Sequence, residues 1–211
     1  MKKLVLTNEV ITREGKIEFK PQNTSIVRGV SQSAKNLVKD IKGFEKVLDY
    51  GCGSGRNMVY IKDHTNDIKV DGTDITEQLE KEKNRHNDLR CRGCIIVESN
   101  LLKNESYDKI LNTHVLNVIE SDEVKSLVVK DIYDKLKVGG AAYFEVRTKS
   151  DIGSAKTKEK HGDGFKIKKG SHFTYQEPLT KEKMKYLLES NGFNIVSHIF
   201  NSSRHMVVVS K

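Results

Sequence analysis

Short hydrophobic runs alternate along the chain with longer segments in which apolar residues recur every three or four positions. The runs at 46–51 and 107–113 predict buried strands, and the segment 121–137 predicts an amphipathic helix. Strands and helices that follow one another in this way favour a parallel sheet with helices on both faces. Further strands are expected at 68–75, 94–99 and 141–148, the last after a break at Gly139 and Gly140, and further helices at 56–64 and 76–90.

The C-terminal part of the chain departs from this alternation. A helix at 181–191 is followed by two strand-like runs, at 193–200 and 205–210, that flank the turn sequence NSSR. Two strands joined by a short polar turn predict a hairpin. We therefore expect a Rossmann-like, doubly wound α/β sheet, mostly parallel, with an antiparallel hairpin on one edge.

The N-terminal part is predicted to lie outside this alternation. Two β-prone runs flank Glu14 and Gly15 and suggest another hairpin. Residues 1–45 are therefore interpreted as an appendage to a single domain that spans 1–211, a length that suits one domain. Polar residues that suit helix N-caps stand at the expected helix starts, namely Ser31, Thr76 and Ser121.

Composition narrows the class of protein. The chain carries a formal net charge of +8, which invites a polyanionic partner, although a lysine-rich composition alone would produce the same excess. No run approaches the length of a membrane span, and the N-terminus lacks the apolar core of a secretory signal. Three cysteines cannot all pair within the chain, which suits a reducing compartment. A cytoplasmic protein without a membrane segment is expected.

Three glycines at alternate positions follow the strand at 46–51 in the sequence VLDYGCGSGRN. Gly51 is expected to make a tight exit turn, and Gly53 and Gly55 to remove the Cβ atoms that would hold a ligand away from the backbone. The turn opens a helix at Arg56, where the fingerprint of dinucleotide-binding proteins would need Gly or Ala. A small molecule is therefore expected at this turn, and the pattern argues against a dinucleotide.

The sequence resembles the class I S-adenosylmethionine-dependent methyltransferases. The residues that carry the resemblance are VLDYGCGSG, the acid in DGTDI, the segment LNTHVLNVI and the segment LKVGGAAYFEV. It also looks like the small methyltransferases of phages and mobile elements, which have a segment similar to Thr24, Ile26 and Arg28 before the glycine loop. The resemblance implies S-adenosylmethionine as the cofactor, with the following residues around it: Arg28, Asp49, Gly51, Gly53, Gly55, Asp74, Asn100, Leu101 and Asn112.

The resemblance also assigns parts of the cofactor to particular residues. The backbone from Asp49 to Gly55 would cradle the methionine portion, and Asp74, at the end of the next strand, would accept hydrogen bonds from the ribose hydroxyls. Asn100 and Leu101 would flank the adenine. Arg28 would pair with the cofactor carboxylate, unless it is a surface arginine.

The methyl acceptor is expected beyond the carboxyl ends of the parallel strands. Thr113 and His114 follow the strand at 107–113, and Arg147 follows the next one. His114 is the candidate base or orienting donor, because a histidine is largely neutral at physiological pH, and Arg147 is the second candidate for catalysis. A structural role for His114 is the alternative.

A basic insertion at 148–176 is predicted to form a flexible lid beside this acceptor site. Between Thr148 and His172 it has seven lysines and three acids, so a phosphate backbone or a charged substrate would bind there, unless the lysines only face solvent. The residues expected to contact the acceptor are Thr113, Lys166, Lys168, Tyr175 and Gln176.

These features predict a methyltransferase that acts on a nucleic acid or a nucleotide. The alternatives are a small-molecule or protein methyltransferase and a cofactor-binding module without turnover. The strand at 107–113 ends in NTHV, so the Pro-containing motifs of the amino-methylating and cytosine-C5 DNA enzymes are absent from that place. The oligomeric state is not indicated.

The sequence CRGC at 91–94 raises the question of a metal site. With His86 it offers three zinc ligands, but a structural zinc site usually needs four. A redox motif of this kind would open a helix after a strand, whereas this one is expected to end a helix and lead into a strand. We expect packing to explain the two cysteines and expect no metal.

Overall fold

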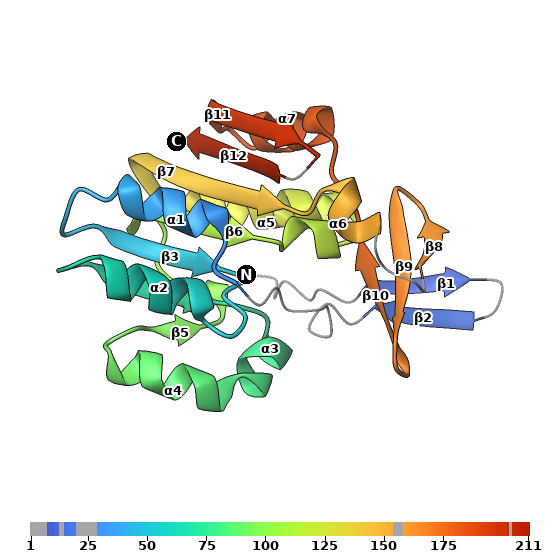
Figure 1. Cartoon of the computed structure of the whole chain (residues 1–211), viewed down its shortest axis with the longest axis horizontal. Coiled ribbons are helices and arrows are strands. Elements are labelled where there is room, and N and C mark those ends of the chain that lie inside the picture. The colour runs from blue at the N-terminus through green and yellow to red at the C-terminus, as the bar shows by residue number, and fades with distance from the viewer. Residues whose placement is uncertain (1–7, 13–14, 20–28, 154–157, 203) are drawn as a thin grey trace.

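The protein folds into two sheets of unequal size (Figure 1). The computed structural model describes residues 8–12, 15–19, 29–153, 158–202 and 204–211. A seven-stranded sheet forms the centre of the molecule, and a five-stranded sheet lies beyond the ends to which the parallel strands point (Figure 1). Arg28 and the segment around Thr24 lie outside the described residues.

The central sheet has the strand order β11-β12-β7-β6-β3-β4-β5. The five strands from β7 to β5 run parallel, while β12 is antiparallel to β7 and β11 is antiparallel to β12. The predicted mostly parallel sheet with an antiparallel hairpin on one edge is confirmed. The strands are β3 (Lys46–Tyr50), β4 (Lys69–Thr73), β5 (Ile96–Val97), β6 (Tyr107–Thr113), β7 (Leu136–Val146), β11 (Asn194–Asn201) and β12 (Arg204–Ser210).

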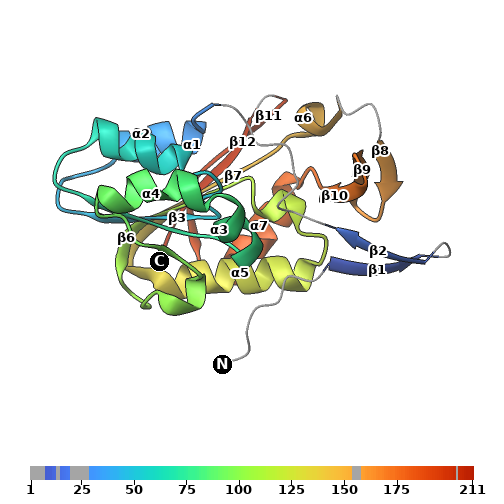
Figure 2. The ribbon, with the colours of Figure 1, turned by 90° about the horizontal axis from the view of Figure 1, so that it is seen from below.

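Helices cover both faces of this sheet (Figure 2). Side chains alternate across a strand, so Val47 and Leu48 of β3 enter two separate cores. The core with Val47 receives side chains from α1, α2 and α4, and the core with Leu48 receives them from α5 and α7. The helices are α1 (Gln32–Lys39), α2 (Arg56–His64), α3 (Thr76–Lys81), α4 (Lys83–Cys91), α5 (Asp122–Lys135) and α7 (Lys181–Glu189).

Two of the three expected helix caps are present. The hydroxyl of Ser31 accepts a hydrogen bond from the amide of Ala34, and Ser121 caps α5 in the same way. Thr76 is not a cap: it is the first helical residue of α3, and its hydroxyl donates to Glu98 instead, at 2.6 Å. This contact links the start of α3 to the segment after β5.

The boundaries of two strands differ from those expected. β5 is reduced to two residues, and β7 begins at Leu136 and continues through Gly139 and Gly140. Gly139 has a φ of +77°, and a Cβ on Gly140 would lie 2.9 Å from the carbonyl oxygen of Asp108. The glycines therefore do not break the strand, because they permit an irregular stretch of β7 to pass close to β6.

The five-stranded sheet joins the two segments of the chain that were expected to be an appendage and a lid. Its order is β1-β2-β10-β9-β8, antiparallel except for one parallel contact between Phe19 and Phe173. The expected N-terminal hairpin is present. The strands are β1 (Asn8–Thr12), β2 (Gly15–Phe19), β8 (Lys158–His161), β9 (Gly164–Lys169) and β10 (His172–Gln176).

The described residues of the basic segment are therefore not the loop that its lysines suggested. They form the short helix α6 (Lys149–Gly153) and three antiparallel strands. Gly162 and Gly170 have φ values of +53° and +58°, which suit the tight turns between these strands. Lys166 and Lys168 alternate with apolar residues in β9, and Lys158 and Lys160 lie at alternate positions of β8, so these lysines occupy strand positions.

Candidate functional site

The glycine loop connects β3 to α2 at the carboxyl ends of the parallel strands (Figure 1). The amides of Gly51 and Cys52 donate to the carbonyl oxygen of Thr73, at 2.8 and 3.0 Å. The amide of Gly55 donates to the carbonyl oxygen of Cys52 at 2.8 Å, which closes the turn. The loop is therefore held against the end of β4, next to the N-terminus of α2.

The three glycines of this loop serve different purposes. All have positive φ values, of +84° at Gly51, +52° at Gly53 and +78° at Gly55. A Cβ on Gly51 would lie 2.2 Å from Val115, and one on Gly55 would lie 2.3 Å from Leu89. These two glycines therefore let the protein pack against the loop. At Gly53 the nearest atom would be 4.0 Å away, so only this glycine faces open space.

Asp74, the predicted ribose ligand, is tied to the glycine loop. One carboxylate oxygen accepts from the amide of Gly53 and the other from the amide of Ile75, both at 2.8 Å. Burial raises the pKa of Asp74 to about 6 in spite of these hydrogen bonds. A carboxylate has about four acceptor positions, so its oxygens can still accept hydrogen bonds from two hydroxyl groups.

Asp49 carries the least satisfied charge in the loop region. Its side chain is buried, and neither carboxylate oxygen has a hydrogen-bond partner. Burial, together with the nearby Asp74, raises the pKa of Asp49 to about 7. An unpaired buried carboxylate is costly, so the residue fits a ligand that brings a positive charge to the loop. S-Adenosylmethionine has such a charge on its α-amino group and on its sulfonium.

Asn112, at the end of β6, is another buried polar residue next to β3. Its amide nitrogen donates to the carbonyl oxygen of Tyr50 at 3.1 Å, while its amide oxygen has no partner. The side chain is fully buried. A hydrogen bond to the backbone fixes the amide, so its oxygen is oriented to accept from a ligand.

The adenine neighbours predicted from the sequence lie one strand further along the sheet. Asn100 and Leu101 belong to a 3-10 helix, η2 (Ser99–Leu101), that directly follows β5. Both side chains are exposed, and Leu101 is 69% exposed. A large apolar side chain in solvent at this end of the sheet suits the face of an aromatic ring.

Sequence reasoning missed the role of His86. This histidine lies in α4, is fully buried, and places its Nε2 2.7 Å from the carbonyl oxygen of Gly53. A carbonyl only accepts, so Nε2 carries the hydrogen and His86 holds the loop from the α4 side. The sequence has no local signal for this contact, because the two residues are 33 positions apart.

The two cysteines of CRGC do not share an environment. Cys91 is exposed, whereas Cys94 is buried in the core with Val47. Within the described part of the chain, no group of three or more histidine, cysteine and acidic side chains is placed to hold a metal ion. In the same residues, no helix has the length and apolar character needed to cross a membrane.

His114 follows β6 in a backbone conformation that a histidine seldom adopts. Its φ is +59°, and its amide donates to the carbonyl oxygen of Glu145 at 2.7 Å. The other described non-glycine residues with positive φ are Phe44, Asp67 and Glu105, which precede strands. His114 follows one, at the same end as the glycine loop. Such strain is concentrated at functional sites.

The other two predicted residues near this strand end lie on different sides. Thr113 faces α1, where its hydroxyl lies 3.1 Å from the hydroxyl of Ser33. The amide of Ser33 donates to the carboxylate of Glu145 at 2.7 Å, so this polar cluster holds α1 on the sheet. Arg147 directly follows β7 and is half-buried.

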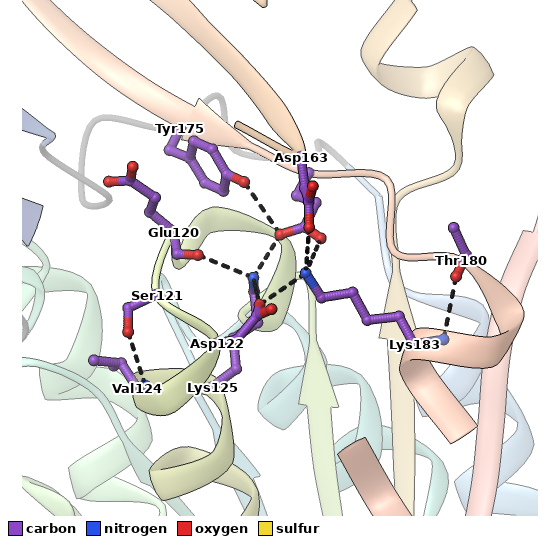
Figure 3. Close-up of polar contacts among 10 residues, drawn as sticks. Glu120, Ser121, Asp122, Val124, Lys125, Asp163, Tyr175, Thr180 and Lys183 are labelled. Atoms are coloured by element: carbon purple, nitrogen blue, oxygen red, sulfur yellow. Dashed lines mark hydrogen bonds and ion pairs between the residues drawn. The ribbon is translucent and has the colours of Figure 1, made fainter. Parts of the chain in front are cut away.

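The small sheet is fixed to the core by a buried group of charges (Figure 3). The ammonium of Lys125 in α5 is fully buried, where it contacts the carboxylates of Glu177 and Asp122. Lys183 of α7 reaches the same two carboxylates, at 2.7 and 2.8 Å, and also Asp163 in the turn between β8 and β9. The group therefore joins two core helices to the small sheet.

This group uses one of the side chains that were expected to contact the acceptor. Tyr175 of β10 is buried, and its hydroxyl donates to Glu177 at 3.1 Å (Figure 3). Lys166 is paired with Glu159 at 3.1 Å and also lies over the ring of Phe173. Gln176 is buried, and its side-chain oxygen has no partner.

The fold and the glycine loop are typical of α/β proteins that bind a small cofactor at the ends of their parallel strands. A family model described as a methyltransferase domain matches residues 23–198. The chain therefore belongs to this family of methyltransferases. A search of curated proteins gives no match.

Solved structures of methyltransferases share the fold. An S-adenosylmethionine-dependent methyltransferase from Clostridium acetobutylicum superposes with a TM-score of 0.63 at 16% identity, over 83% of this chain and 87% of that one. One from Methanosarcina mazei gives a TM-score of 0.63 at 18% identity, over 83% and 96%. The 1,6-didemethyltoxoflavin-N1-methyltransferase of Burkholderia thailandensis, solved with its namesake heterocycle and S-adenosylhomocysteine, gives 0.59 at 19% identity, over 84% and 74%.

The protein is thus an S-adenosylmethionine-dependent methyltransferase of class I, and S-adenosylmethionine is its cofactor. The sequence-based expectations of fold, family, enzyme class and cofactor are confirmed.

Proposed function

We propose that the protein transfers a methyl group from S-adenosylmethionine to a nucleobase, either in a nucleic acid or in a nucleotide. The observation that carries this proposal is the small sheet, which brings basic strands to the ends of the parallel strands (Figure 1). Acceptors bind at this end of open α/β sheets. Lysines there suit an acceptor with phosphate groups.

The cofactor is proposed to lie across the ends of β3, β4 and β5. The open side of Gly53 would admit the methionine portion, and the unpaired carboxylate of Asp49 would receive its ammonium group. Asp74 would hold the ribose, and Asn100 and Leu101 would border the adenine. The remaining proposed cofactor neighbours are Gly51 and Gly55, which shape the loop, Asn112, with its unpaired amide oxygen, and Arg28.

When bound, the cofactor supplies a methyl group already activated by the sulfonium. The chain then needs to hold the acceptor in line and to remove a proton where the acceptor atom carries one. Positioning of this kind is worth on the order of 7–11 kcal/mol in well-oriented pairs. We propose His114 as the base or orienting donor, because its backbone is held at the strand end, and Arg147 as an orienting charge.

The structure changes which residues we assign to the acceptor, because several of the expected contacts have partners within the protein. Thr113 is engaged with Ser33, so we assign it to the packing of α1. Tyr175 is engaged with Glu177, and Lys166 with Glu159, so neither is assigned to the acceptor, and Lys168 shares their side of the sheet. Gln176, whose oxygen has no partner, remains as the proposed contact.

A small heterocyclic acceptor is the second candidate. The neighbour from Burkholderia thailandensis is named for a methyl transfer to a nitrogen of such a molecule. A nucleobase is also a nitrogen heterocycle, so the two candidates differ in the phosphate and sugar that the acceptor carries. A protein acceptor and a module without turnover have no specific support in the described contacts.

The test is to incubate the protein with radiolabelled cofactor and separate fractions of DNA, RNA, nucleotides, proteins and metabolites. We expect label in a nucleic-acid or nucleotide fraction. In the active fraction, His114→Ala should lower turnover by roughly 10²- to 10⁴-fold, while the affinity for the cofactor, measured by calorimetry, stays unchanged. Label confined to proteins or to metabolites without phosphate would overturn the proposed acceptor.

A further inference from the structure

The cross-strand register divides the side chains of the small sheet between two faces. Successive residues of a strand point to opposite faces, and residues directly opposite one another point to the same face. Gln176 is opposite Phe165, which is opposite Lys160, and Thr174 is opposite Ile167, which is opposite Lys158. We call this row of six the Gln176 face. The other row, the Tyr175 face, consists of Phe173, Tyr175, Lys166, Lys168, Glu159 and His161.

The Tyr175 face is occupied by contacts within the protein. The ring of Tyr175 packs edge-on against His161 and Phe19, and the hydroxyl of Tyr175 donates a hydrogen bond to Glu177. His161 in turn contacts the carboxylate of Glu120 at 2.8 Å, just before α5. This face therefore rests on the core, and its polar groups are used in holding the small sheet there.

The Gln176 face has polar atoms that the protein leaves unused. The hydroxyl of Thr174 and the side-chain oxygen of Gln176 are buried and have no hydrogen-bond partner. A buried polar group without a partner costs roughly 1–3 kcal/mol. Two of them at alternate positions of one strand indicate that a ligand supplies the missing hydrogen bonds.

A third unused side chain comes from the core. Asn117 lies in the 3-10 helix η3 (Leu116–Val118), three residues after His114, and its carbonyl oxygen accepts from the amide of Glu177 at 2.8 Å. The side chain is fully buried, and neither its nitrogen nor its oxygen has a partner. The contact places Asn117 beside the end of β10, so core and sheet both contribute neutral polar groups at this place.

The outer part of the Gln176 face is aromatic and basic. The ring of Phe165 lies on the middle strand, with the ammonium groups of Lys158 and Lys160 at 5.6 and 5.3 Å from its centre. Both lysines are exposed. Across β8, β9 and β10, Lys160, Phe165 and Gln176 thus form one row over two strand spacings, about 10 Å.

We propose that the Gln176 face binds the acceptor as a nucleobase with its phosphate. Neutral amide and hydroxyl groups suit the donors and acceptors on the edge of a base, an aromatic ring suits its plane, and lysines suit the phosphate. Asn117, Thr174 and Gln176 take the base, and Lys158 and Lys160 take the phosphate. This inference rests on the proposed function, and it adds which face of the small sheet binds the acceptor.

Two double variants with the same change of charge test the choice of face. Binding of a labelled mixed-sequence single-stranded oligonucleotide is measured by fluorescence anisotropy at several salt concentrations. Lys158→Gln with Lys160→Gln should reduce the slope of log affinity against log salt by about 1.4, because each lost phosphate contact on a single strand removes about 0.7. Lys166→Gln with Lys168→Gln, on the Tyr175 face, should leave the slope unchanged.

Two nearly isosteric variants test the recognition of the base. Gln176→Leu and Thr174→Val should each weaken binding roughly 5- to 100-fold, because the ligand loses a partner in a buried place. The thermal midpoint of the free protein should stay the same or rise, because an unsatisfied buried polar group is removed. A purely structural role would instead lower the midpoint together with the affinity.

The outcomes separate this inference from the proposed function. Binding of the oligonucleotide that depends equally on both lysine pairs, or only on Lys166 and Lys168, overturns the assignment of the face and leaves the acceptor class intact. No binding of the oligonucleotide or of a mixture of nucleoside monophosphates overturns both. Binding of the monophosphates alone, weakened by Gln176→Leu, supports the face and identifies a nucleotide as the acceptor.

Discussion

The junction between the central sheet and the small sheet treats buried charges in the opposite way to the carboxyl ends of the parallel strands. At the junction between the two, charges are buried but fully paired, as Lys125 is with Glu177 and Asp122. At the ends of the parallel strands, Asp49 is buried without any partner. Paired charges hold two parts of a protein together, whereas an unpaired one indicates the place of a ligand. The comparison separates structural from functional polar groups by what each contacts.

The largest expected effect concerns the junction. Lys125→Ala should lower the free energy of unfolding by roughly 3–5 kcal/mol, because it leaves the buried carboxylate of Glu177 without its partner on α5. Chemical denaturation measures the change. Lys130→Ala on the same helix is the control: its pair with Asp134 is exposed, so the loss should stay below about 0.5 kcal/mol. Equal losses in the two variants would contradict the structural role of the buried pair.

Asp49→Asn should act in the opposite direction. The pKa of Asp49 is about 7 in the folded protein, against about 3.9 in an unfolded chain. Between about pH 4 and pH 7 the folded state therefore keeps the proton on Asp49 while the unfolded state loses it. The free energy of unfolding falls as the pH rises through this range. The shift corresponds to at most about 4 kcal/mol at pH 8, which the substitution would restore.

The measurement is denaturation of both proteins at pH 5 and pH 8. The variant should lose less stability than the parent between the two values, and at pH 8 it should bind S-adenosylmethionine more weakly. A variant that is less stable than the parent by the same amount at both values would show that Asp49 serves the fold and not a ligand.

The glycine loop offers a comparison within a single turn. Gly55→Ala should destabilise the protein by roughly 1–3 kcal/mol more than Gly53→Ala, because its new methyl group meets Leu89 at 2.3 Å whereas that on Gly53 meets open space. Both share the cost of a positive φ. Gly53→Val should in turn exclude the cofactor, as calorimetry would show. Tight cofactor binding by that variant would move the methionine portion away from this glycine.

The last expected effect is on the ribose side of the cofactor. Asp74→Asn should weaken S-adenosylmethionine binding by about 1.5–3 kcal/mol, the usual worth of hydrogen bonds to a charged group. Asparagine retains one oxygen, so only one of the amides of Gly53 and Ile75 keeps its acceptor, and part of the loop geometry is retained. Unchanged affinity in calorimetry would show that Asp74 only holds the loop.

The sequence by itself determined the alternation of strands and helices, the edge hairpin, the caps at Ser31 and Ser121, and a glycine turn suited to a small ligand, while the cofactor followed from the family resemblance. Each depends on residues that are close in the chain: alternating apolar positions, a serine before a helix, and glycines behind a strand. Interactions between neighbours in the sequence do not need the tertiary structure to be read.

The tertiary structure alone decided which polar groups are used and which are left over. His86 reaches Gly53 across 33 positions, β2 meets β10 from the opposite part of the chain, and the lysines of one basic segment divide between two faces. A lysine-rich segment looks the same in the sequence whether it forms a loop or strands. Only the pairing of strands fixes which side chains share a face, since a shift of one residue would exchange the faces.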